Sequence, residues 1–551
     1  MLLGAVLLLI TISISSYWYY QQEQQRAAAI ERMTGTLTVG STVELAACDP
    51  YLFTGYWCWI LGGTAIYEPL VKGSPEIIYP KPEDYRPWLA ESWTMANDGL
   101  SYTFKLRKDV KFHDGTPFNA SCVAFHMKRI MTDEWAKKYG LGWKKAWNGY
   151  LYDCLDDNNP ATVIDNYTVK LNLKYKFAPF IANIGSTWLT AFESPTAVAK
   201  WGPEYNFHPV GTGPFKFVSW ERGKELVLQR NDQYWGNKPK IKTMVWRTFK
   251  DISAMTMALE NGEIDVTYAE ASVADLPRLT KNPKLTVNQG HGDINVPQVI
   301  INYRNKDLGN PKVRQAIAQA IDREQLCKVA YKGFATPLYS VVPKSMFGDW
   351  SVDVFKNYPY DPEKAKQLLA EAGYKPGQIK VKYVIYMAHP SIMDEAVMIK
   401  DYLDKIGIDC ELDLRDTTVA KSMRREGLFD MVWFGWVYDY PDAENELTYA
   451  MSYQGQLSSC IGYTQNLTSG WGYADQRDRI GKLLAIAQGS TNYNERLSAV
   501  RTLQEIYGEH IVGIPLAAIP TYLIYQNNVH GLVLTGGIRW AIDWTVVYKT
   551  A

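Results

Sequence analysis

Residues 379–436 read IKVKYVIYMAHPSIMDEAVMIKDYLDKIGIDCELDLRDTTVAKSMRREGLFDMVWFGW, and this stretch decides the fold class. Alternation of apolar and polar residues predicts three strands, at 379–387, 408–414 and 429–436. Apolar residues spaced three and four apart predict two helices between them, at 391–406 and about 417–426. This order of strands and helices indicates a parallel sheet with right-handed crossovers, so we expect an α/β fold.

A further helix precedes the first of these strands. Asp361 is a suitable N-cap, Pro362 fits the first helical position, and Ala365 and Leu368 follow at helical spacing. Gly373 is the residue type that commonly ends a helix. The clearest alternation of helices and strands therefore begins at about residue 361.

The sequence GWVYDYPDAEN (435–445) starts at the carboxyl end of the third predicted strand. In open α/β sheets, ligands bind beyond the carboxyl ends of the strands. Three carboxylates, Asp439, Asp442 and Glu444, lie there among aromatic residues. Such a group could be a glycosidase's acid pair, a metal site or an anchor for a cation, and the stretch alone leaves these alternatives open.

The overall composition limits the possible classes of protein. A single core stops growing at about 250–300 residues, so a chain of 551 residues should have two or three domains. The 58 Lys and Arg balance the 58 Asp and Glu, which argues against nucleic-acid binding. The 19 Trp and 37 Tyr suit either a ligand-stacking surface or large α/β cores.

Residues 2–20, LLGAVLLLITISISSYWYY, carry no charge and approach the roughly 20 residues of a membrane helix. A signal peptide has a basic start and a cleavage site close behind its apolar run. Here no Lys or Arg precedes Arg26, and the small residues 27–29 lie well beyond the apolar run. We expect an uncleaved anchor on the extracytoplasmic face of the membrane, with a cleaved signal peptide as the alternative. Three sequons fit a glycosylated extracellular surface: Asn119, Asn166 and Asn466.

The seven cysteines contain no C-x-x-C pair, which argues against zinc-ribbon and thioredoxin-type chemistry. Their odd number leaves at least one thiol free or paired between chains. Proximity in sequence favours two disulfides outside the membrane: Cys48–Cys58 and Cys122–Cys154.

Common catalytic motifs are missing from the sequence. It contains no HExxH, no GxxxxGK[ST] and no GxSxG, and no histidine has a partner at the spacing of metal ligands on a helix. FHDG (112–115) is typical of a turn, and Pro214 in GTGPF (211–215) lacks the backbone donor that a phosphate cradle needs. We therefore expect a binding protein rather than an enzyme, with no catalytic residue, metal or cofactor.

Eight segments point to a family when they are taken in order. They are IYEPLV (66–71), LAESWTMANDGLSYTFKLRKDVKFHDGTPF (89–118), VGTGPFKF (210–217), RNDQYW (230–235), NGEIDV (261–266), VRQAIAQAIDRE (313–324), YDPEKAKQLLAEAGY (360–374) and FDMVWFGWVYDYPDAEN (429–445). Through them, nearly all of 36–551 resembles the extracytoplasmic solute-binding proteins of ABC importers, specifically the oligopeptide/dipeptide-binding family (family 5). The resemblance implies a two-lobed periplasmic-binding-protein-like fold (type II, cluster C) with a two-stranded hinge.

The resemblance also implies a division of the chain, with an extra subdomain inserted in lobe I. The expected parts are an anchor and linker at 1–35, lobe I at 36–60, 186–287 and 520–551, the inserted subdomain at 61–185, and lobe II at 288–519. In such proteins the ligand closes the lobes, and the closed form docks on a membrane permease that separate ATPase subunits drive.

In peptide-binding members, the aspartate of a GWxxDY-like segment pairs with the peptide's α-amino group. The resemblance assigns this role to Asp439, main-chain bonds to Gly435 and Val437, and the wall of the site to Trp436, Tyr438 and Tyr440. A buried ammonium needs a charged partner, which agrees with this role. The alternative for Asp439 is a buried ion pair with a local arginine such as Arg415, while Asp442 and Glu444 suit a solvated loop or a helix cap.

We expect a cell-surface receptor that captures oligopeptides or dipeptides by lobe closure and delivers them to an importer permease. Relatives with similar motifs bind oligosaccharides or nickel complexes, and several tryptophans could stack on sugars: Trp57, Trp59, Trp433 and Trp436. An oligosaccharide receptor, a membrane-anchored surface coat that associates laterally, and a hydrolase using Asp439 with Asp442 or Glu444 are the alternatives. No motif identifies the residue that would hold a peptide's carboxylate.

Overall fold

The structure is a computed structural model of the whole chain. It describes residues 35–44, 47–52, 65–73, 84–139, 141, 153–185, 191–268, 272–289, 295–386, 389–452, 476–519, 522–532, 534–535 and 541–550. Several sequence predictions lie outside these residues: the anchor at 2–20, Cys58, Trp57, Trp59 and the sequon at Asn466. Within these ranges, no helix combines the length and apolarity needed to cross a membrane.

The predicted strand–helix–strand–helix–strand unit is confirmed. Its strands are β15 (Ile379–Ile385), β16 (Ile408–Leu414) and β17 (Met431–Val437), all parallel, with β15 in the middle. Two more strands, β13 (Asn295–Ile301) and β18 (Gly513–Pro515), extend the sheet to the order β16-β15-β17-β13-β18. The predicted unit is therefore parallel, whereas the whole sheet is mixed because β13 runs antiparallel to both β17 and β18.

The helices of this region begin and end close to the predicted residues. Asp361 caps α12 (Pro362–Glu371) by accepting a hydrogen bond from the Lys364 N–H at 2.8 Å, and Gly373 has φ +89° just beyond the helix. The crossover helices are α13 (Pro390–Lys405) and α14 (Thr417–Glu426). The same lobe contains α9 (Pro311–Ala320), α10 (Arg323–Val329), α11 (Lys344–Phe347), α15 (Glu444–Met451), α16 (Arg477–Gly489) and α17 (Tyr493–His510).

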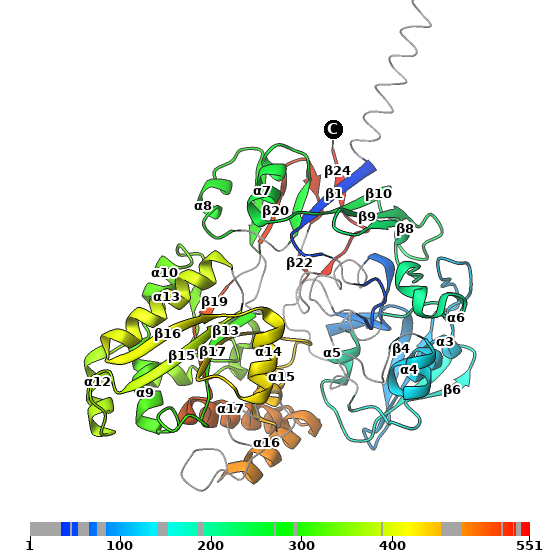
Figure 1. Cartoon of the computed structure of the whole chain (residues 1–551). Helices are drawn as coiled ribbons and strands as arrows, with labels where there is room; N and C mark the ends of the chain where they lie inside the picture. Colours follow the sequence, from blue (N-terminus) through cyan, green and yellow to red (C-terminus); the bar gives the residue numbers. More distant parts are fainter. Residues whose placement is uncertain are drawn as a thin grey trace, which may run out of the picture.

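A second sheet has seven strands in the order β12-β20-β11-β1-β10-β9-β8. Its members are β1 (Thr36–Ser41), β8 (Phe215–Glu221), β9 (Glu225–Arg230), β10 (Thr243–Thr248), β11 (Val266–Tyr268), β12 (Leu285–Gln289) and β20 (Tyr522–Gln526). Strand β20, from near the end of the chain, lies between β11 and β12, so distant parts of the chain share this sheet. In Figure 1 the blue strand β1 and the red strand β20 belong to this one sheet, with β11 between them.

A third, antiparallel sheet lies between β1 and β8 in the sequence. It has the order β4-β5-β7-β6, with strands β4 (Ala90–Met95), β5 (Ser101–Leu106), β6 (Ala161–Asp165) and β7 (Thr168–Asn172). The helices around it are α3 (Ala120–Met131), α4 (Asp133–Lys138), α5 (Phe180–Gly185) and α6 (Pro195–Trp201). Two further helices come after β10 in the sequence: α7 (Ile252–Glu260) and α8 (Leu276–Leu279). The smaller pairs are β2 (Val71–Gly73) with β3 (Tyr85–Pro87), β14 (Thr336–Pro337) with β19 (Ala517–Ala518), β21 (Val529–His530) with β24 (Tyr548–Lys549), and β22 (Leu534–Thr535) with β23 (Ala541–Ile542).

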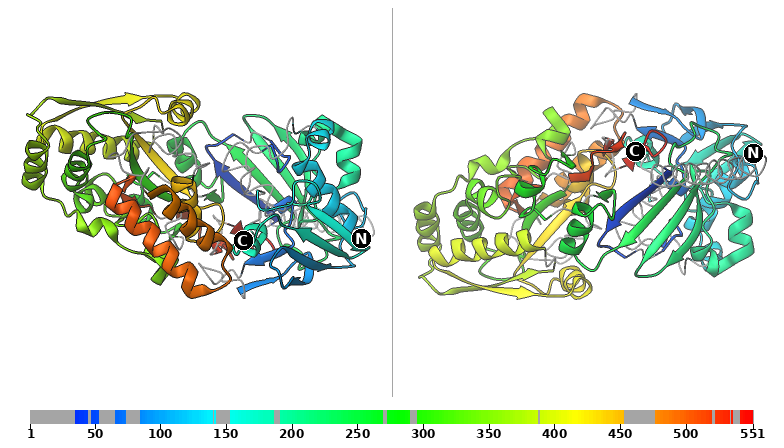
Figure 2. Two further views of the ribbon diagram at one scale, coloured as in Figure 1. Left: turned by 90° about the horizontal axis from the view of Figure 1, so that it is seen from below. Right: turned by 90° about the horizontal axis from the view of Figure 1, so that it is seen from above.

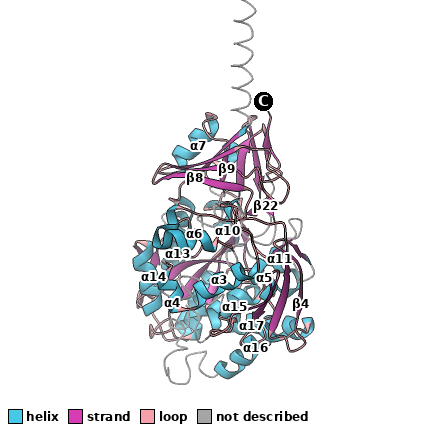
Figure 3. Cartoon of the chain, turned by 90° about the vertical axis from the view of Figure 1, so that its right-hand side faces the viewer, coloured by secondary structure: helices cyan, strands magenta, loops and turns pink. Residues whose placement is uncertain are grey.

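The chain forms two lobes that lie side by side. Views from below and above show a green-to-orange lobe beside a predominantly blue-to-green one (Figure 2). The chain passes from the seven-stranded to the five-stranded sheet between β12 and β13, and returns between β19 and β20. Seen from the side, β8 and β9 lie at one end of the molecule and α16 and α17 at the other (Figure 3).

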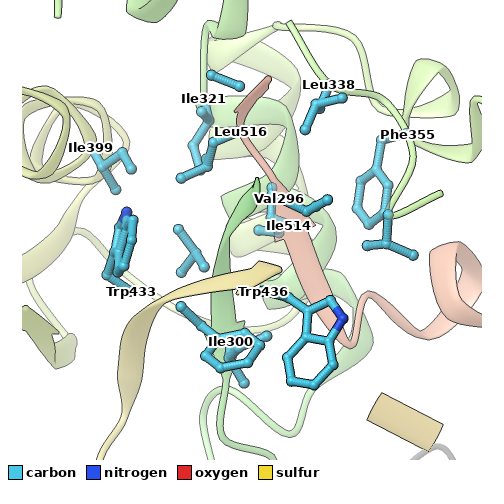
Figure 4. Close-up of a cluster of buried hydrophobic side chains, with 14 of the residues drawn as sticks. Val296, Ile300, Ile321, Leu338, Phe355, Ile399, Trp433, Trp436, Ile514 and Leu516 are labelled. Carbon is cyan, nitrogen blue, oxygen red and sulfur yellow. The ribbon is translucent and has the colours of Figure 1, made fainter. Parts of the chain in front are cut away.

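Trp433 and Trp436 lie on opposite sides of β17, and both pack in the core of the second lobe. Figure 4 shows Trp433 beside Ile399 of α13. The Trp433 side chain is fully buried, and its Nε1 donates a hydrogen bond to Glu395 Oε1 at 2.8 Å. Trp433 is therefore a core residue, and its assignment as a possible sugar-stacking residue was wrong.

The predicted Cys122–Cys154 disulfide is not formed. Cys122 carries a buried thiol whose Sγ lies 3.6 Å from the carbonyl oxygen of Pro117 and 3.4 Å from Asn119 Oδ1. Burial raises the pKa of this thiol to about 11, with smaller opposing and reinforcing contributions from its neighbours. Asn119, predicted as a glycosylation site, caps α3 by accepting a hydrogen bond from the Cys122 N–H.

Candidate ligand-binding site

The predicted site residues lie where β17 ends. Gly435, Trp436 and Val437 are its last three residues, and Tyr438, Asp439 and Tyr440 follow directly. The main-chain geometry of this strand follows from its partner β13. The carbonyl of Pro297 accepts a hydrogen bond from Leu516, so the backbone of Pro297 points away from β17.

Pro297 pairs with Gly435 in register, and Asn295 pairs with Val437. In an antiparallel pair, the residues that do not bond to each other direct their N–H and C=O groups to opposite outer edges. Gly435 and Val437 therefore direct these groups toward the side of β17 occupied by β15. However, β15 pairs with β17 only at Met431 and Val432, so among the described strands none covers this edge at Gly435 or Val437.

A side chain occupies part of this edge. A hydrogen bond links the Gly435 backbone to Tyr386, which follows β15. Burial raises the pKa of the Tyr386 hydroxyl, and both Arg424 and this backbone hydrogen bond act in the opposite direction. The last residues of β17 thus form an edge that meets side chains rather than another described strand.

The close packing at Gly435 explains why this position has no side chain. A Cβ there would lie 2.7 Å from Trp433 Cη2 and 2.9 Å from Asn295 Oδ1. Both distances are shorter than normal contacts to a Cβ. Glycine allows the indole and the amide to approach the strand on the face that also carries Val437.

Asp439 lies in a buried turn that α15 supports. The residue is 8% exposed, and its N–H donates a hydrogen bond to Asn445 Oδ1 at 3.1 Å. Arg415, the example named for a local ion pair, is not the partner of Asp439, because Arg415 Nε binds Asp413 Oδ1 at 2.7 Å on the surface. Asp439 is close enough to the buried Glu446 carboxyl for its charge to raise the pKa of that group, although burial is the larger cause.

The aromatic residues predicted to line the site have different roles. Trp436 is packed against Tyr449 of α15, with ring centres 3.7 Å apart. The Tyr438 hydroxyl is 2.8 Å from the Val341 carbonyl, which fixes this side chain in the core. Tyr440 contacts Phe177 of the other lobe edge to face, with ring centres 6.0 Å apart. Tyr440 therefore contributes to the contact between the lobes.

Asp442 and Glu444 have partners within the fold. Asp442 Oδ2 binds Arg496 Nη2 at 2.7 Å, and its Oδ1 accepts a hydrogen bond from the N–H of Glu444 at the start of α15. Glu444 is fully buried and accepts hydrogen bonds from Tyr440 and Thr448. Burial, reinforced by Asp442, raises the pKa of Glu444 to about 7. Asp442 thus accepts a hydrogen bond from the first residue of α15 while Ala443 is the N-cap of this helix, and the solvated-loop interpretation was wrong for Glu444.

The sequence analysis missed two charged residues near this edge. Arg424 of α14 is 6% exposed and donates from Nη2 to the Tyr449 hydroxyl at 3.1 Å. Glu446 is fully buried, and its Oε1 accepts a hydrogen bond from Gln298 Nε2 at 2.7 Å. Arg424 follows the buried Ala420 by four residues, and this helical spacing could have placed it on the inner face.

Metal-ion and phosphate sites have no support in the described ranges. These contain no group of three His, Cys, Asp or Glu side chains that could hold a metal ion. FHDG forms the predicted turn, in which Asp114 Oδ1 accepts a hydrogen bond from Thr116 and Gly115 has φ +87°. Gly211 of GTGPF is packed against the Ile66 backbone, so this glycine allows close approach of two segments.

Two lobes connected by two crossings, with a polar edge at the end of a central strand, define a solute-binding protein. The chain belongs to the bacterial extracellular solute-binding proteins, family 5, whose middle region matches residues 84–457. The two-lobed α/β fold expected from the resemblance is confirmed.

Similar proteins include the glutathione-binding protein GsiB of Shigella dysenteriae serotype 1. It is 30% identical over 456 residues, which cover 80% of this chain and 82% of that protein. A solved structure of the periplasmic binding protein DppA from Helicobacter pylori in complex with the peptide STSA has 27% identity and a TM-score of 0.77. The match covers 94% of this chain and 98% of that one.

A dipeptide-binding protein from Pseudoalteromonas sp. SM9913, in complex with Met-Leu, shares the same fold. It has a TM-score of 0.79 and 23% identity, and the match covers 93% of this chain and 100% of that chain. These comparisons place the chain in a class of solute-binding receptors that includes peptide-binding members.

Proposed function

We propose that this protein is an extracytoplasmic receptor that captures a peptide by closure of its two lobes and delivers it to an ABC importer permease. The observation that carries the proposal is the end of β17. There the backbones of Gly435 and Val437 face an edge that no described strand covers, directly before Asp439.

The chemistry of this edge suits a peptide. A peptide in extended conformation can pair with the free edge of a strand through main-chain hydrogen bonds. Its α-ammonium needs a carboxylate where water is excluded, because a buried charge without a partner is costly. Asp439, two residues beyond Val437, supplies such a carboxylate. We therefore assign main-chain binding to Gly435 and Val437 and ammonium binding to Asp439.

The relatives support a peptide over a sugar. The proteins named above are described as binding glutathione, the peptide STSA and Met-Leu. Sugar recognition usually needs exposed rings, whereas Trp433 is fully buried and Trp436 is packed against Tyr449. We take glutathione, a dipeptide and a tetrapeptide as the first ligands to test.

We also propose that the parts of the chain follow the division expected from the family resemblance. Lobe I would comprise 36–60, 186–287 and 520–551, with 61–185 inserted in it, and lobe II would comprise 288–519. Residues 1–35 would tether or export the protein. The receptor would bind its ligand without chemical change and carry no metal or cofactor.

Native mass spectrometry of the purified protein would identify a co-purified ligand. Calorimetry with glutathione, Met-Leu, Ser-Thr-Ser-Ala and cellotetraose then tests whether the ligand is a peptide or an oligosaccharide. Saturable binding of at least one peptide, recovered intact afterwards, is the expected result. Binding of the oligosaccharide together with no binding of any peptide would overturn the peptide assignment.

A further inference from the structure

The second lobe has a cavity of about 400 Å³ near the start of β17, away from the candidate ligand-binding site. Residues that follow β13 and residues that precede β17 line it, among them Asn302 and Asp430. The Asn302 N–H donates to the Asp430 carbonyl at 2.9 Å. Gly435 lies five residues beyond Asp430, which is about 17 Å along an extended strand. The cavity is therefore separate from the edge at Gly435.

Apolar side chains form one wall of this cavity. Val384 of β15 and Phe429 are buried, and Met423 of α14 is partly buried. Leu428 also lines the cavity and is 60% exposed. A bound molecule that covered Leu428 would remove apolar surface from water, which is favourable. The cavity thus suits a ligand with an apolar body.

The acidic side chains that line the cavity already have partners. Asp430 Oδ1 accepts a hydrogen bond from Asn305 Nδ2 at 2.8 Å, and its Oδ2 accepts one from the backbone N–H of Lys382 at 2.9 Å. Asp413 Oδ1 binds Arg415 Nε at 2.7 Å. Groups of the protein itself therefore hold both carboxylates.

The basic side chains of the cavity, in contrast, have no acidic partner. Neither Arg304 nor Lys382 forms an ion pair with any residue in the described ranges, and this includes Glu411, which lies opposite Lys382 on β16. Arg304 Nη1 donates to the Glu426 carbonyl at 2.7 Å, while its buried Nε has no hydrogen-bond partner among the described residues. Buried N–H groups ordinarily have a partner, so this Nε is suited to an acceptor from outside the chain.

A glycine positions the guanidinium of Arg304. Gly427 follows α14 with φ +69°, and a Cβ there would lie 3.1 Å from Arg304 Cζ and closer still to Nη1. Glycine therefore lets the guanidinium pack against the backbone at the end of the helix. A guanidinium held in this way loses little conformational freedom when it binds an anion.

We propose that this cavity binds a small organic carboxylate whose charged group is held by Arg304 and Lys382. A guanidinium binds carboxylates through hydrogen bonds of defined geometry, and the ammonium adds a second positive charge. The volume of about 400 Å³ falls within the range of small-molecule sites, roughly 300–1,000 Å³. The proposal is independent of the proposed peptide binding, because none of the residues assigned to the peptide lines this cavity.

Ligand-observed NMR titration of the full chain with hexanoate, and with hexan-1-ol as its uncharged analogue, tests the site. Hexanoate should bind saturably, and hexan-1-ol at least about tenfold more weakly, because hydrogen bonds to a charged group are the stronger ones. Lys382→Gln should weaken hexanoate binding about fivefold, and Arg304→Gln at least about tenfold. Lys380→Gln is the matched control, because Lys380 lies on the same face of β15, pairs with Asp409 and does not line the cavity. This variant should keep the wild-type affinity.

No saturable binding of hexanoate to the wild type would overturn the proposal, and so would equal affinities for hexanoate and hexan-1-ol. Neither comparison needs a variant that could fail to fold. Equal losses in Lys382→Gln and Lys380→Gln would place hexanoate elsewhere on the protein and would also overturn it. Urea unfolding checks that Arg304→Gln is folded, and Lys382→Gln, which changes an exposed side chain, decides the assignment if it is not.

Discussion

Gly435 lies opposite Pro297 in the antiparallel pair of β13 and β17, and its own backbone groups point to the edge that no described strand covers. Gly435→Ala would place a Cβ 2.7 Å from the Trp433 ring. Overpacking of this kind costs about 1–3 kcal/mol, so we expect a lower free energy of unfolding and weaker peptide binding. Urea unfolding and calorimetry check both effects.

Gly481→Ala is the matched control for this substitution. Gly481 lies in α16, and a Cβ there would meet no atom within 4 Å. In an exposed helix, alanine is more stable than glycine by about 1 kcal/mol, so this variant should be slightly stabilised. A loss of stability equal to that of Gly435→Ala would contradict the packing argument.

Asp439→Asn keeps the shape of the side chain and removes its charge. Loss of one partner from a charge pair in a water-excluded site costs about 2–5 kcal/mol, which is roughly 30-fold to several thousand-fold in affinity. Peptides with acetylated N-termini should bind poorly to the wild type and lose little further in the variant. Calorimetry with free and acetylated peptides measures the coupling, and Asp401→Asn, in an exposed pair with Lys405, is the control. If the affinity lost on acetylating the peptide and the affinity lost in Asp439→Asn simply add, Asp439 does not bind the peptide's ammonium group.

Arg129 holds together a fully buried ion-pair network in the first lobe. It pairs with Asp49 and with Glu193, whose Oε1 is 3.2 Å from Nη1. Arg129→Met would leave two buried carboxylates without this cation, and breaking a buried pair costs about 3–5 kcal/mol. We expect a large drop in the unfolding midpoint of this lobe. Lys366→Met removes an exposed pair with Glu363 and should cost less than about 1 kcal/mol; similar losses in both variants would contradict the role of the network.

Glu395 predicts a pH dependence of stability. Burial raises its pKa to about 7, even though hydrogen bonds from Tyr331 and Trp433 oppose the shift. The folded pKa lies above the unfolded value, so the stabilising contribution is complete below about pH 4.5 and is lost as the pH rises through 7. Glu395→Gln removes the titration, and the stability of the variant relative to the wild type should increase between pH 5 and 8 by roughly 3 kcal/mol. Urea unfolding at several pH values measures this difference, and a pH-independent difference would exclude ionisation of Glu395.

The sequence predicted the elements whose signals are local. The bounds of β16 and α14 agree with the predicted ranges because alternation and helical spacing are properties of neighbouring residues. Asp361 and Gly373 likewise mark the ends of α12 through local backbone chemistry. Local patterns therefore sufficed for the strand–helix unit that carries the site.

Features that depend on distant residues could not be predicted in this way. The antiparallel addition of β13 to β17 pairs residues 130 to 142 positions apart, from Ile301 with Met431 to Asn295 with Val437, and this pairing orients the Gly435 backbone. The complete burial of Trp433 and the contact between Arg424 and the Phe434 ring also depend on tertiary packing. Trp433 and Trp436 were both interpreted from the sequence as possible sugar-stacking residues, although side chains alternate along a strand and these two lie on opposite faces of β17.

The insertion of β20 between β11 and β12 has a consequence for the order of folding during translation. The strands of the second lobe, from β13 to β18, emerge from the ribosome before β20 and can complete their own sheet. The seven-stranded sheet cannot close until residues 522–526 have been synthesised, because β11 and β12 have no direct pairing with each other. The first lobe to begin synthesis is thus the last to finish folding, and its unpaired strand edges need protection while the second lobe is being made.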